Sequence, residues 1–129
     1  MSHPNETVLR EAYAAFAKED IPGFLAHCTP GVTFRMPGQG LLAGHHTVEA
    51  FFAKLGPAMQ AVRGTLREEV LHVLAGDDQG FVVVAQSAER DGRLYKWNCS
   101  HWWRIEKGRL AEFQEFVDDP VAYESAWKV

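Results

Sequence analysis

The sequence predicts an α+β fold in which helices come first and a curved antiparallel sheet follows. Apolar residues recur at helical spacing between Glu6 and Lys18, which predicts an amphipathic first helix. Four extended runs fill the second half of the chain, with turn signals between them. Helices followed by an antiparallel meander are typical of folds whose helices pack together on one face of the sheet.

The length and composition predict one ordinary globular domain covering residues 1–129. The net charge is −4, and the Lys and Arg residues are scattered singly, which argues against a nucleic-acid partner. No apolar run approaches the roughly 20 residues of a membrane span, and the first residues lack the features of a signal peptide. We therefore expect a cytoplasmic protein without nucleic-acid or membrane partners. Cys28 and Cys99 fit no metal or redox spacing, so we expect free, at least partly buried thiols.

Two further helices are expected before the long strands. Asp20 caps a short second helix that has Pro22 in its first turn. A brief strand over Val32–Met36 follows. A third helix starts near Thr47, and we expect Gly56 to stop it.

The sheet is expected to contain four long strands joined by tight turns. Asp91-Gly92 and Lys107-Gly108 are hairpin signals, and Asp119-Pro120 opens a short terminal helix. The expected strands are Thr65–Leu74, Gly80–Glu89, Arg93–Ile105 and Arg109–Val117.

The last turn, at residues 106–108, decides which side chains of the last two strands share a face. A two-residue turn would place Lys107 in the left-handed region, which a non-glycine residue resists. A three-residue loop needs that conformation only at Gly108. We therefore expect the three-residue loop, which puts His101 opposite Phe113. One face then holds Cys99, His101, Trp103, Ile105, Ala111, Phe113, Glu115 and Val117.

His101 and Glu115 are the titratable groups on this otherwise apolar face. Burial raises the pKa of a carboxylic acid and lowers that of a histidine, whereas their mutual attraction acts in the opposite direction. One interpretation is a buried, fully hydrogen-bonded pair that fixes the strand register. The other interpretation is a pair that lines a small-molecule cavity between the sheet and the helices.

Short motifs are spaced along nearly the whole chain: Gly44–Phe52 with its Val-x-x-Phe-Phe pattern, Trp103–Ile105, Gly108–Leu110 and Phe116–Asp118. Their order and spacing resemble the SnoaL-like branch of the nuclear transport factor 2-like superfamily, to which ketosteroid isomerases and polyketide cyclases also belong. The resemblance implies a cone-shaped half-barrel with three N-terminal helices on its concave face, a cavity between them, and a homodimer formed through the outer face. It implies no particular reaction, because this fold hosts many.

The resemblance also implies roles for individual residues. His101 matches the protonated Asp of the isomerases' oxyanion hole and a pocket histidine of the cyclases. Glu115 matches the cyclases' acid–base aspartate, and Tyr13 lies on the same helix as the isomerases' oxyanion tyrosine. Met36 stands where the isomerases carry their catalytic Asp. A thioether cannot accept a proton from carbon, so steroid isomerisation by the usual mechanism is excluded.

Aromatic side chains are candidates for the pocket wall, although each taken singly is more often a core residue. On the opposite, more polar face, Trp102 and Phe116 predict a dimer interface. The candidate ligand-binding residues are Phe16, Phe34, Trp97, Cys99, Trp103 and Phe113.

No metal site and no cofactor are expected. His45 and His46 are adjacent, and neither has a partner at ligand spacing. Gly38-Gln39-Gly40 lacks the pattern of a phosphate-binding loop. Cys99 lies two positions from His101 on one strand face, but apolar surroundings would keep its thiol protonated.

We expect a small-molecule pocket protein that acts as an isomerase, cyclase or lyase on an apolar, carbonyl-containing metabolite. In this hypothesis Glu115 moves a proton, and His101 with Tyr13 stabilises a developing oxyanion. Two alternatives stay open at this point. The same cavity can hold a ligand without catalysis, or the domain is a structural or interaction module with His101 and Glu115 sealed from solvent.

Overall fold

A six-stranded sheet and four helices make up the described part of the chain, residues 3–129 of the computed structural model. The strand order is β2-β1-β6-β5-β4-β3, and β1 runs parallel to β6 whereas the other neighbours are antiparallel. The elements are α1 (Pro4–Ala17), α2 (Ile21–Leu25), β1 (Cys28–Met36), β2 (Gly44–Thr47), α3 (Val48–Ala61), β3 (Arg67–Ala75), β4 (Gln79–Arg90), β5 (Arg93–Glu106), β6 (Arg109–Val117) and α4 (Pro120–Trp127).

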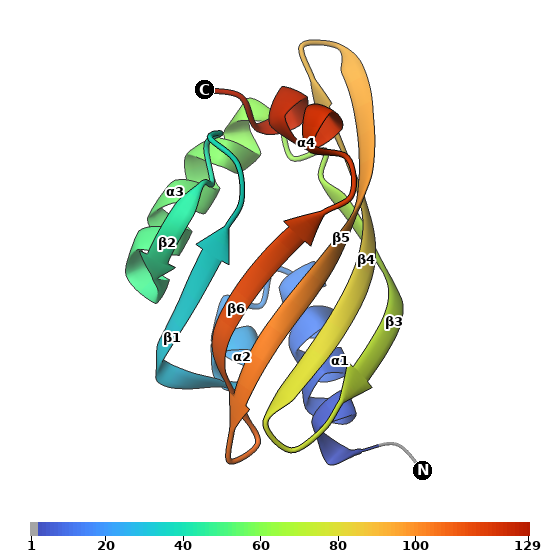
Figure 1. Cartoon of the computed structure of the whole chain (residues 1–129). Coiled ribbons are helices and arrows are strands. Elements are labelled where there is room, and N and C mark those ends of the chain that lie inside the picture. Colours follow the sequence, from blue (N-terminus) through green and yellow to red (C-terminus); the bar gives the residue numbers. More distant parts are fainter. Residues whose placement is uncertain (1–2) are drawn as a thin grey trace.

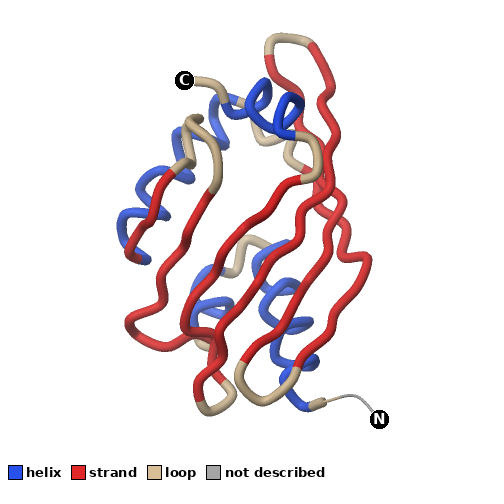
Figure 2. Tube along the Cα trace, viewed as in Figure 1, coloured by secondary structure: helices blue, strands red, loops and turns tan. Residues whose placement is uncertain are grey.

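The long strands bend together, and the helices gather on the concave side of the sheet (Figure 1). Helix α1 packs on β3 and β4, α2 packs on β1, and α3 lies beside β1 and β2. Helix α4 crosses the end of the sheet and packs on β4 and β5, as the tube view also shows (Figure 2). The predicted α+β class and curved sheet are confirmed. None of the described helices has the length and apolar character that a membrane span requires.

Local capping explains where the helices start. The Asp20 side chain accepts a hydrogen bond from the Gly23 amide at the start of α2, and Thr47 does the same at the start of α3. The expected stop of α3 at Gly56 is wrong, because the helix continues to Ala61. Its apolar face continues to Ala58, which is fully buried, so tertiary packing outweighs the glycine.

Two short extended pieces differ from the expectation. Strand β1 begins at Cys28 rather than Val32, with a register shift between Cys28 and Thr33 that leaves Pro30 and Gly31 exposed. Strand β2 was not predicted at all. Its sequence shows no apolar alternation, and it is extended because it pairs with the edge of β1.

The turn between β5 and β6 is a two-residue turn, so the expected three-residue loop is wrong. Glu106 pairs with Arg109, and both central residues have positive φ, 48° at Lys107 and 76° at Gly108. Two such residues give the mirror-image turn whose twist matches that of paired strands. The fit of this turn to the strands outweighs the strain at Lys107.

A bulge follows the turn and restores the predicted faces. Ile105 pairs with Leu110 and Arg104 with Glu112, which leaves Ala111 as the extra residue. The turn and the bulge together move the pairing by two residues, so each side chain beyond the bulge keeps its expected face, whereas Leu110, on the turn side of the bulge, points inward. His101 therefore lies directly opposite Glu115 instead of Phe113. The buried residues of this face are Cys99, His101, Trp103, Ile105, Leu110, Ala111, Phe113 and Glu115.

The strained turn gives a stability test. We expect Lys107→Asn to raise the free energy of unfolding by roughly 0.5 kcal/mol, because Asn tolerates the left-handed conformation better than Lys does. Urea denaturation measures the change. Lys107→Ala is the matched control, since Ala keeps the same backbone restriction and should give no gain. Equal stabilities of the two variants would contradict the strain at this position.

Candidate functional site

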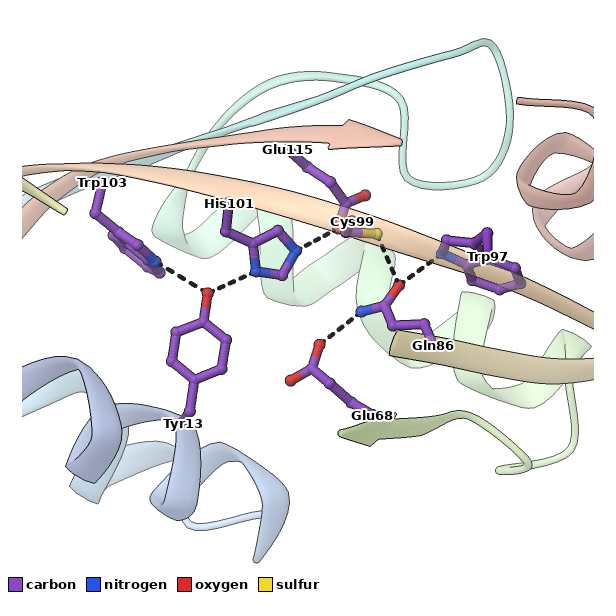
Figure 3. A network of polar contacts seen from close by, with 8 residues as sticks. All are labelled: Tyr13, Glu68, Gln86, Trp97, Cys99, His101, Trp103 and Glu115. Carbon is purple, nitrogen blue, oxygen red and sulfur yellow. Dashed lines mark hydrogen bonds and ion pairs between the residues drawn. The ribbon is translucent and has the colours of Figure 1, made fainter. Parts of the chain in front are cut away.

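Three elements bring four side chains into one buried chain of hydrogen bonds (Figure 3). Helix α1 supplies Tyr13, β5 supplies His101 and Trp103, and β6 supplies Glu115. The Trp103 indole Nε1 donates to the Tyr13 hydroxyl over 3.0 Å. The Tyr13 hydroxyl lies 2.5 Å from His101 Nδ1, and His101 Nε2 lies 2.9 Å from Glu115 Oε2. The structure thus joins the three predicted catalytic residues.

The hydrogen-bond pattern assigns the protons of this chain. The Tyr13 hydroxyl accepts from Trp103, so its own proton is free to go to His101 Nδ1. The proton of a neutral imidazole then lies on Nε2, which donates to the Glu115 carboxylate. A doubly protonated ring would leave the Tyr13 proton without a partner. The network therefore favours a neutral His101 and an ionised Glu115.

The surroundings keep the phenol of Tyr13 protonated. Burial is the main reason that the pKa of Tyr13 is raised well above its ordinary value, and the negative charges of Glu68 and Glu115 raise it further. The hydrogen bond from Trp103 acts in the opposite direction but is smaller. Tyr13 is therefore a permanent hydrogen-bond donor near neutral pH.

Two buried oxygens at the other end of Glu115 have no hydrogen-bond partner among residues 3–129: Glu115 Oε1 and the Tyr123 hydroxyl of α4. Burial, and then the charge of Glu115, raise the pKa of Tyr123. Buried polar atoms without partners are rare in folded proteins. The buried-pair interpretation agrees with the His101–Glu115 bond, whereas Glu115 Oε1 makes no hydrogen bond of normal geometry, although a weaker interaction with the Tyr123 hydroxyl also raises the pKa of Tyr123.

A second branch of polar contacts starts beside Glu115. Gln86 Oε1 accepts from the Cys99 thiol over 3.3 Å and from Trp97 Nε1 over 2.8 Å. Gln86 Nε2 donates to Glu68 over 2.6 Å (Figure 3). Burial, assisted by the charge of Glu115, raises the pKa of the Cys99 thiol. The thiol therefore stays protonated, and Glu68 connects the branch to solvent because its side chain is exposed.

Most of the predicted pocket walls pack against each other in the core. Phe34 packs against Trp103 and Phe113, with ring centroids 6.3 Å and 5.8 Å away. Phe34 also stacks on Phe51 at 4.3 Å. Phe16 contacts Phe24 at the helix side. The geometry gives these aromatic rings a packing role, and His101, at 3% exposure, and Glu115, at 5%, are sealed beside them.

One cavity of about 380 Å³ reaches Glu115 where β1 and β6 diverge. Strand pairing between them ends at Arg35 and Gln114, so the strands separate there. Its lining residues are Arg35, Met36, Pro37, Gln114, Glu115, Phe116 and Val117. Another cavity, of about 470 Å³, lies at the opposite end of the sheet. It is lined by Thr29, Asp78, Ile105, Glu106, Lys107 and Arg109. None of the six predicted ligand-binding residues lines either cavity.

Comparison with known proteins decides the family. The model of the SnoaL-like domain matches residues 9–113. The chain belongs to the SnoaL-like family. An uncharacterized protein of Mycobacterium tuberculosis is 31% identical over 122 residues, which cover 93% of each chain. The solved structure of Bal32a, from a soil-derived mobile gene cassette, is 28% identical, has a TM-score of 0.88, and covers 97% of both chains.

More distant structures share the SnoaL-like fold. TerC, crystallised with polyporic acid, has a TM-score of 0.81 and 21% identity, and the match covers 96% of this chain and 98% of TerC. Solved NTF2-like proteins and a candidate polyketide cyclase superimpose as well. The predicted resemblance to the nuclear transport factor 2-like superfamily is confirmed.

One cluster of the SnoaL-like chain has the residue types of a metal site. Cys99, His101 and Glu115 place one ligand atom each within 4.8 Å of one another. In this arrangement His101 and Glu115 share a proton, and the Cys99 thiol resists ionisation. A bound metal would have to displace both protons. The expectation of no metal stays a prediction.

Several SnoaL-like positions differ from what sequence reasoning found. His46 is buried and bonds to the Leu42 carbonyl oxygen over 3.0 Å, so it does not lie at the surface. Asp118 accepts from the Asn98 amide and fastens the end of the last hairpin. Gln86 and Tyr123 were missed as candidates. Alternation along β4 places Gln86 inward and could have found it, whereas only the docking of α4 reveals Tyr123.

Tyr13 gives a stability test of the hydrogen-bond chain. We expect Tyr13→Phe to lower the free energy of unfolding by about 1–3 kcal/mol, because Trp103 Nε1 and His101 Nδ1 both lose a buried partner. Urea denaturation measures the loss. Tyr95→Phe is the control, because the half-buried Tyr95 hydroxyl makes no hydrogen bond within residues 3–129. An equal loss in both variants would show that the chain adds no stability.

Proposed function

We propose that the SnoaL-like chain binds a small, largely apolar, carbonyl-containing molecule and catalyses a proton transfer on it. The observation that carries the proposal is the Glu115 carboxylate. One of its oxygens is held by His101, and the other is buried without a partner. A buried carboxylate with a free oxygen is suited to accept a proton from a bound molecule. Isomerisation, cyclisation and lyase reactions all use such a step.

Each residue of the hydrogen-bond chain has a part in this proposal. Glu115 Oε1 accepts the proton, while the His101 N–H holds Oε2 and fixes the direction of the carboxylate. Tyr13 fixes the His101 tautomer. Both His101 nitrogens and the Tyr13 hydroxyl are already engaged. Donation to a developing oxyanion therefore requires one of these bonds to be exchanged for a bond to the substrate.

The divergence of β1 and β6 supports a route to the carboxylate. The cavity there contains Glu115 together with the apolar side chains of Met36, Pro37 and Val117. Arg35 and Gln114 line the same cavity, and an apolar wall with a few polar groups is typical of small-molecule sites. Met36 lies beside Glu115 in this wall, and its thioether cannot act as a base. Glu115 is therefore the proposed base, and steroid isomerisation by the usual mechanism stays excluded from the proposal.

Relatives of the same fold support a small aromatic or polyketide-like ligand. TerC has been crystallised with polyporic acid, and IdmH is a candidate polyketide cyclase. Their identities to this chain, 21% and 14%, support the fold and leave the reaction to be tested. A cytoplasmic location, the absence of a cofactor, and the absence of nucleic-acid or membrane partners remain part of the proposal.

A simple ketone gives a test of the proton transfer. The assay follows exchange of the α-hydrogens of 2-tetralone for deuterium in heavy water by proton NMR. We expect the protein to accelerate the exchange, and Glu115→Gln to reduce this acceleration by about 10²–10⁴-fold, because the amide cannot accept the proton. Circular dichroism and urea denaturation establish that the variant is folded.

Glu112→Gln is the matched control. Glu112 lies on the same strand but bonds to Arg104 on the outer face, so its loss should leave the exchange rate unchanged. An unchanged rate in Glu115→Gln would sink the proposed mechanism. Binding of 2-tetralone without any acceleration would instead support the alternative of a binding module.

We also propose that a second copy of the chain covers the outer face of the sheet. Exposed apolar side chains continue across neighbouring strands there, since Leu74 pairs with Phe81 and Phe81 with Trp102. Phe116 is half-exposed on the same face. The Trp102 indole donates to the Gln79 side chain over 3.0 Å. Contiguous exposed apolar surface of this kind is typical of interaction sites.

Phe116 provides the test of this interface. We expect the wild-type chain to have the mass of a dimer in sedimentation equilibrium, and Phe116→Glu to weaken association roughly tenfold or more, because it buries a charge in the interface. Leu94→Glu is the control, since Leu94 is equally exposed but lies at the tip of the β4–β5 hairpin. A monomeric wild type, or equal association of both variants, would contradict the interface.

A further inference from the structure

The polar groups on the concave face have one sign of charge. Glu68, Gln86 and Trp97 are register partners on β3, β4 and β5, and Cys99 and Glu115 continue the row toward β6. Glu68 and Glu115 are its charged groups. Within residues 3–129, Glu115 pairs with His101 and with no Lys or Arg.

Arg90, on the same strand as Gln86, is occupied elsewhere. Arg90 pairs in register with Arg93 at the tip of the β4–β5 hairpin. Its guanidinium donates to the carbonyl oxygens of Ala126 and Lys128 at 3.0 Å and 2.8 Å. No guanidinium within the described part of the chain therefore reaches Glu68 or Glu115 as an ion-pair partner. The electrostatic potential along the row is negative.

The raised pKa values of neighbouring groups support a negative potential along the row. The charges of Glu115 and Glu68 both contribute to the raised pKa values of Tyr13 and Cys99, after burial as the main cause. An anionic ligand placed in the row would meet the same repulsion as a phenolate or thiolate there. It would also have to give up its hydration without a cationic partner in the row, because Arg35, which lines the cavity at Glu115, makes no ion pair with Glu115.

From this geometry we infer that the ligand presents a hydrogen-bond donor, a hydroxyl or a protonated amine, to Glu115 Oε1, and that carboxylate-bearing ligands are rejected. Glu115 Oε1 and the Tyr123 hydroxyl are buried near each other, and neither makes a hydrogen bond of normal geometry within residues 3–129. A hydroxyl on the ligand would donate to Glu115 Oε1 and can also accept from the Tyr123 hydroxyl, whereas a protonated amine can only donate to Glu115 Oε1. This inference rests on the proposed function and adds the chemical class of its substrate.

Three naphthalene probes of similar shape separate the contributions of apolar contact, a hydrogen-bond donor and a negative charge to the binding affinity. Naphthalene tests the apolar site alone, 2-naphthol adds a donor, and 2-naphthoate adds an anion at neutral pH. Isothermal titration calorimetry gives their affinities, and the indole N–H signals of Trp97 and Trp103 in ¹⁵N-labelled protein locate the binding. We expect 2-naphthol to bind roughly tenfold or more tightly than 2-naphthoate, because it makes a hydrogen bond to a charged group.

Variants then show which side chains cause the preference for 2-naphthol over 2-naphthoate. Glu115→Gln should weaken 2-naphthol and strengthen 2-naphthoate, so that the ratio of their affinities falls to about twofold. Tyr123→Phe should weaken 2-naphthol alone. Glu112→Gln, with its charge on the outer face, should leave the ratio unchanged. If Tyr123 and Glu115 merely satisfy each other, Tyr123→Phe lowers stability without changing the ratio, and that result overturns the inference.

The remaining outcomes separate the inference from the proposed function. Tight binding of naphthalene with equal affinities for 2-naphthol and 2-naphthoate would overturn the inference and leave the apolar binding site standing. A preference for 2-naphthoate, or a ratio that survives in Glu115→Gln, would also overturn it. Failure of all three probes to bind would overturn both proposals. If 2-naphthol binds more tightly than 2-naphthoate but the protein does not accelerate hydrogen exchange of 2-tetralone, the donor preference is upheld and catalysis is contradicted.

Discussion

The direct pairing of His101 with Glu115 across β5 and β6 is the interaction on which the interior of this protein depends. It places an imidazole and a carboxylate side by side in a region sealed from solvent. The carboxylate would not be stable there alone, because an unpaired buried charge costs several kcal/mol. Tyr13 and Trp103 extend the pair to α1, so that the sheet and the first helix share one hydrogen-bonded chain. The position of the helix on the sheet is thereby tied to the protonation of the pair.

The pairing depends in turn on two irregularities that compensate for each other. The two-residue turn at Lys107-Gly108 alone would place inward side chains on the outer face. The extra residue at Ala111 corrects the alternation before His101 is reached. A strained turn and a bulge are thus required by the buried pair at the far end of the hairpin. Local preference at Lys107 gives way to a register that places His101 directly opposite Glu115.

Sequence patterns predicted the parts of the fold that alternation and capping control. The four long strands, the caps at Asp20 and Thr47 and the shared face of His101 and Glu115 follow from residue order alone. The length of α3, the existence of β2 and the turn geometry depend on contacts between distant segments, which a local pattern does not contain. The candidate site shows the same limit. Tyr13, His101 and Glu115 were predicted, whereas Tyr123 enters the site only through the docking of α4.

A purely structural role explains the burial of His101 and Glu115 but does not explain the composition around them. A pair retained only for stability would be expected to satisfy all its oxygens, since each buried atom without a partner costs about 1–3 kcal/mol. Here Glu115 Oε1 and the Tyr123 hydroxyl make no hydrogen bond of normal geometry, and Glu68 adds a second negative charge without an ion-pair partner within residues 3–129. These features lower stability in the free protein. They become favourable when a donor-bearing apolar molecule occupies the space beside Glu115, which is the arrangement that a binding site selects.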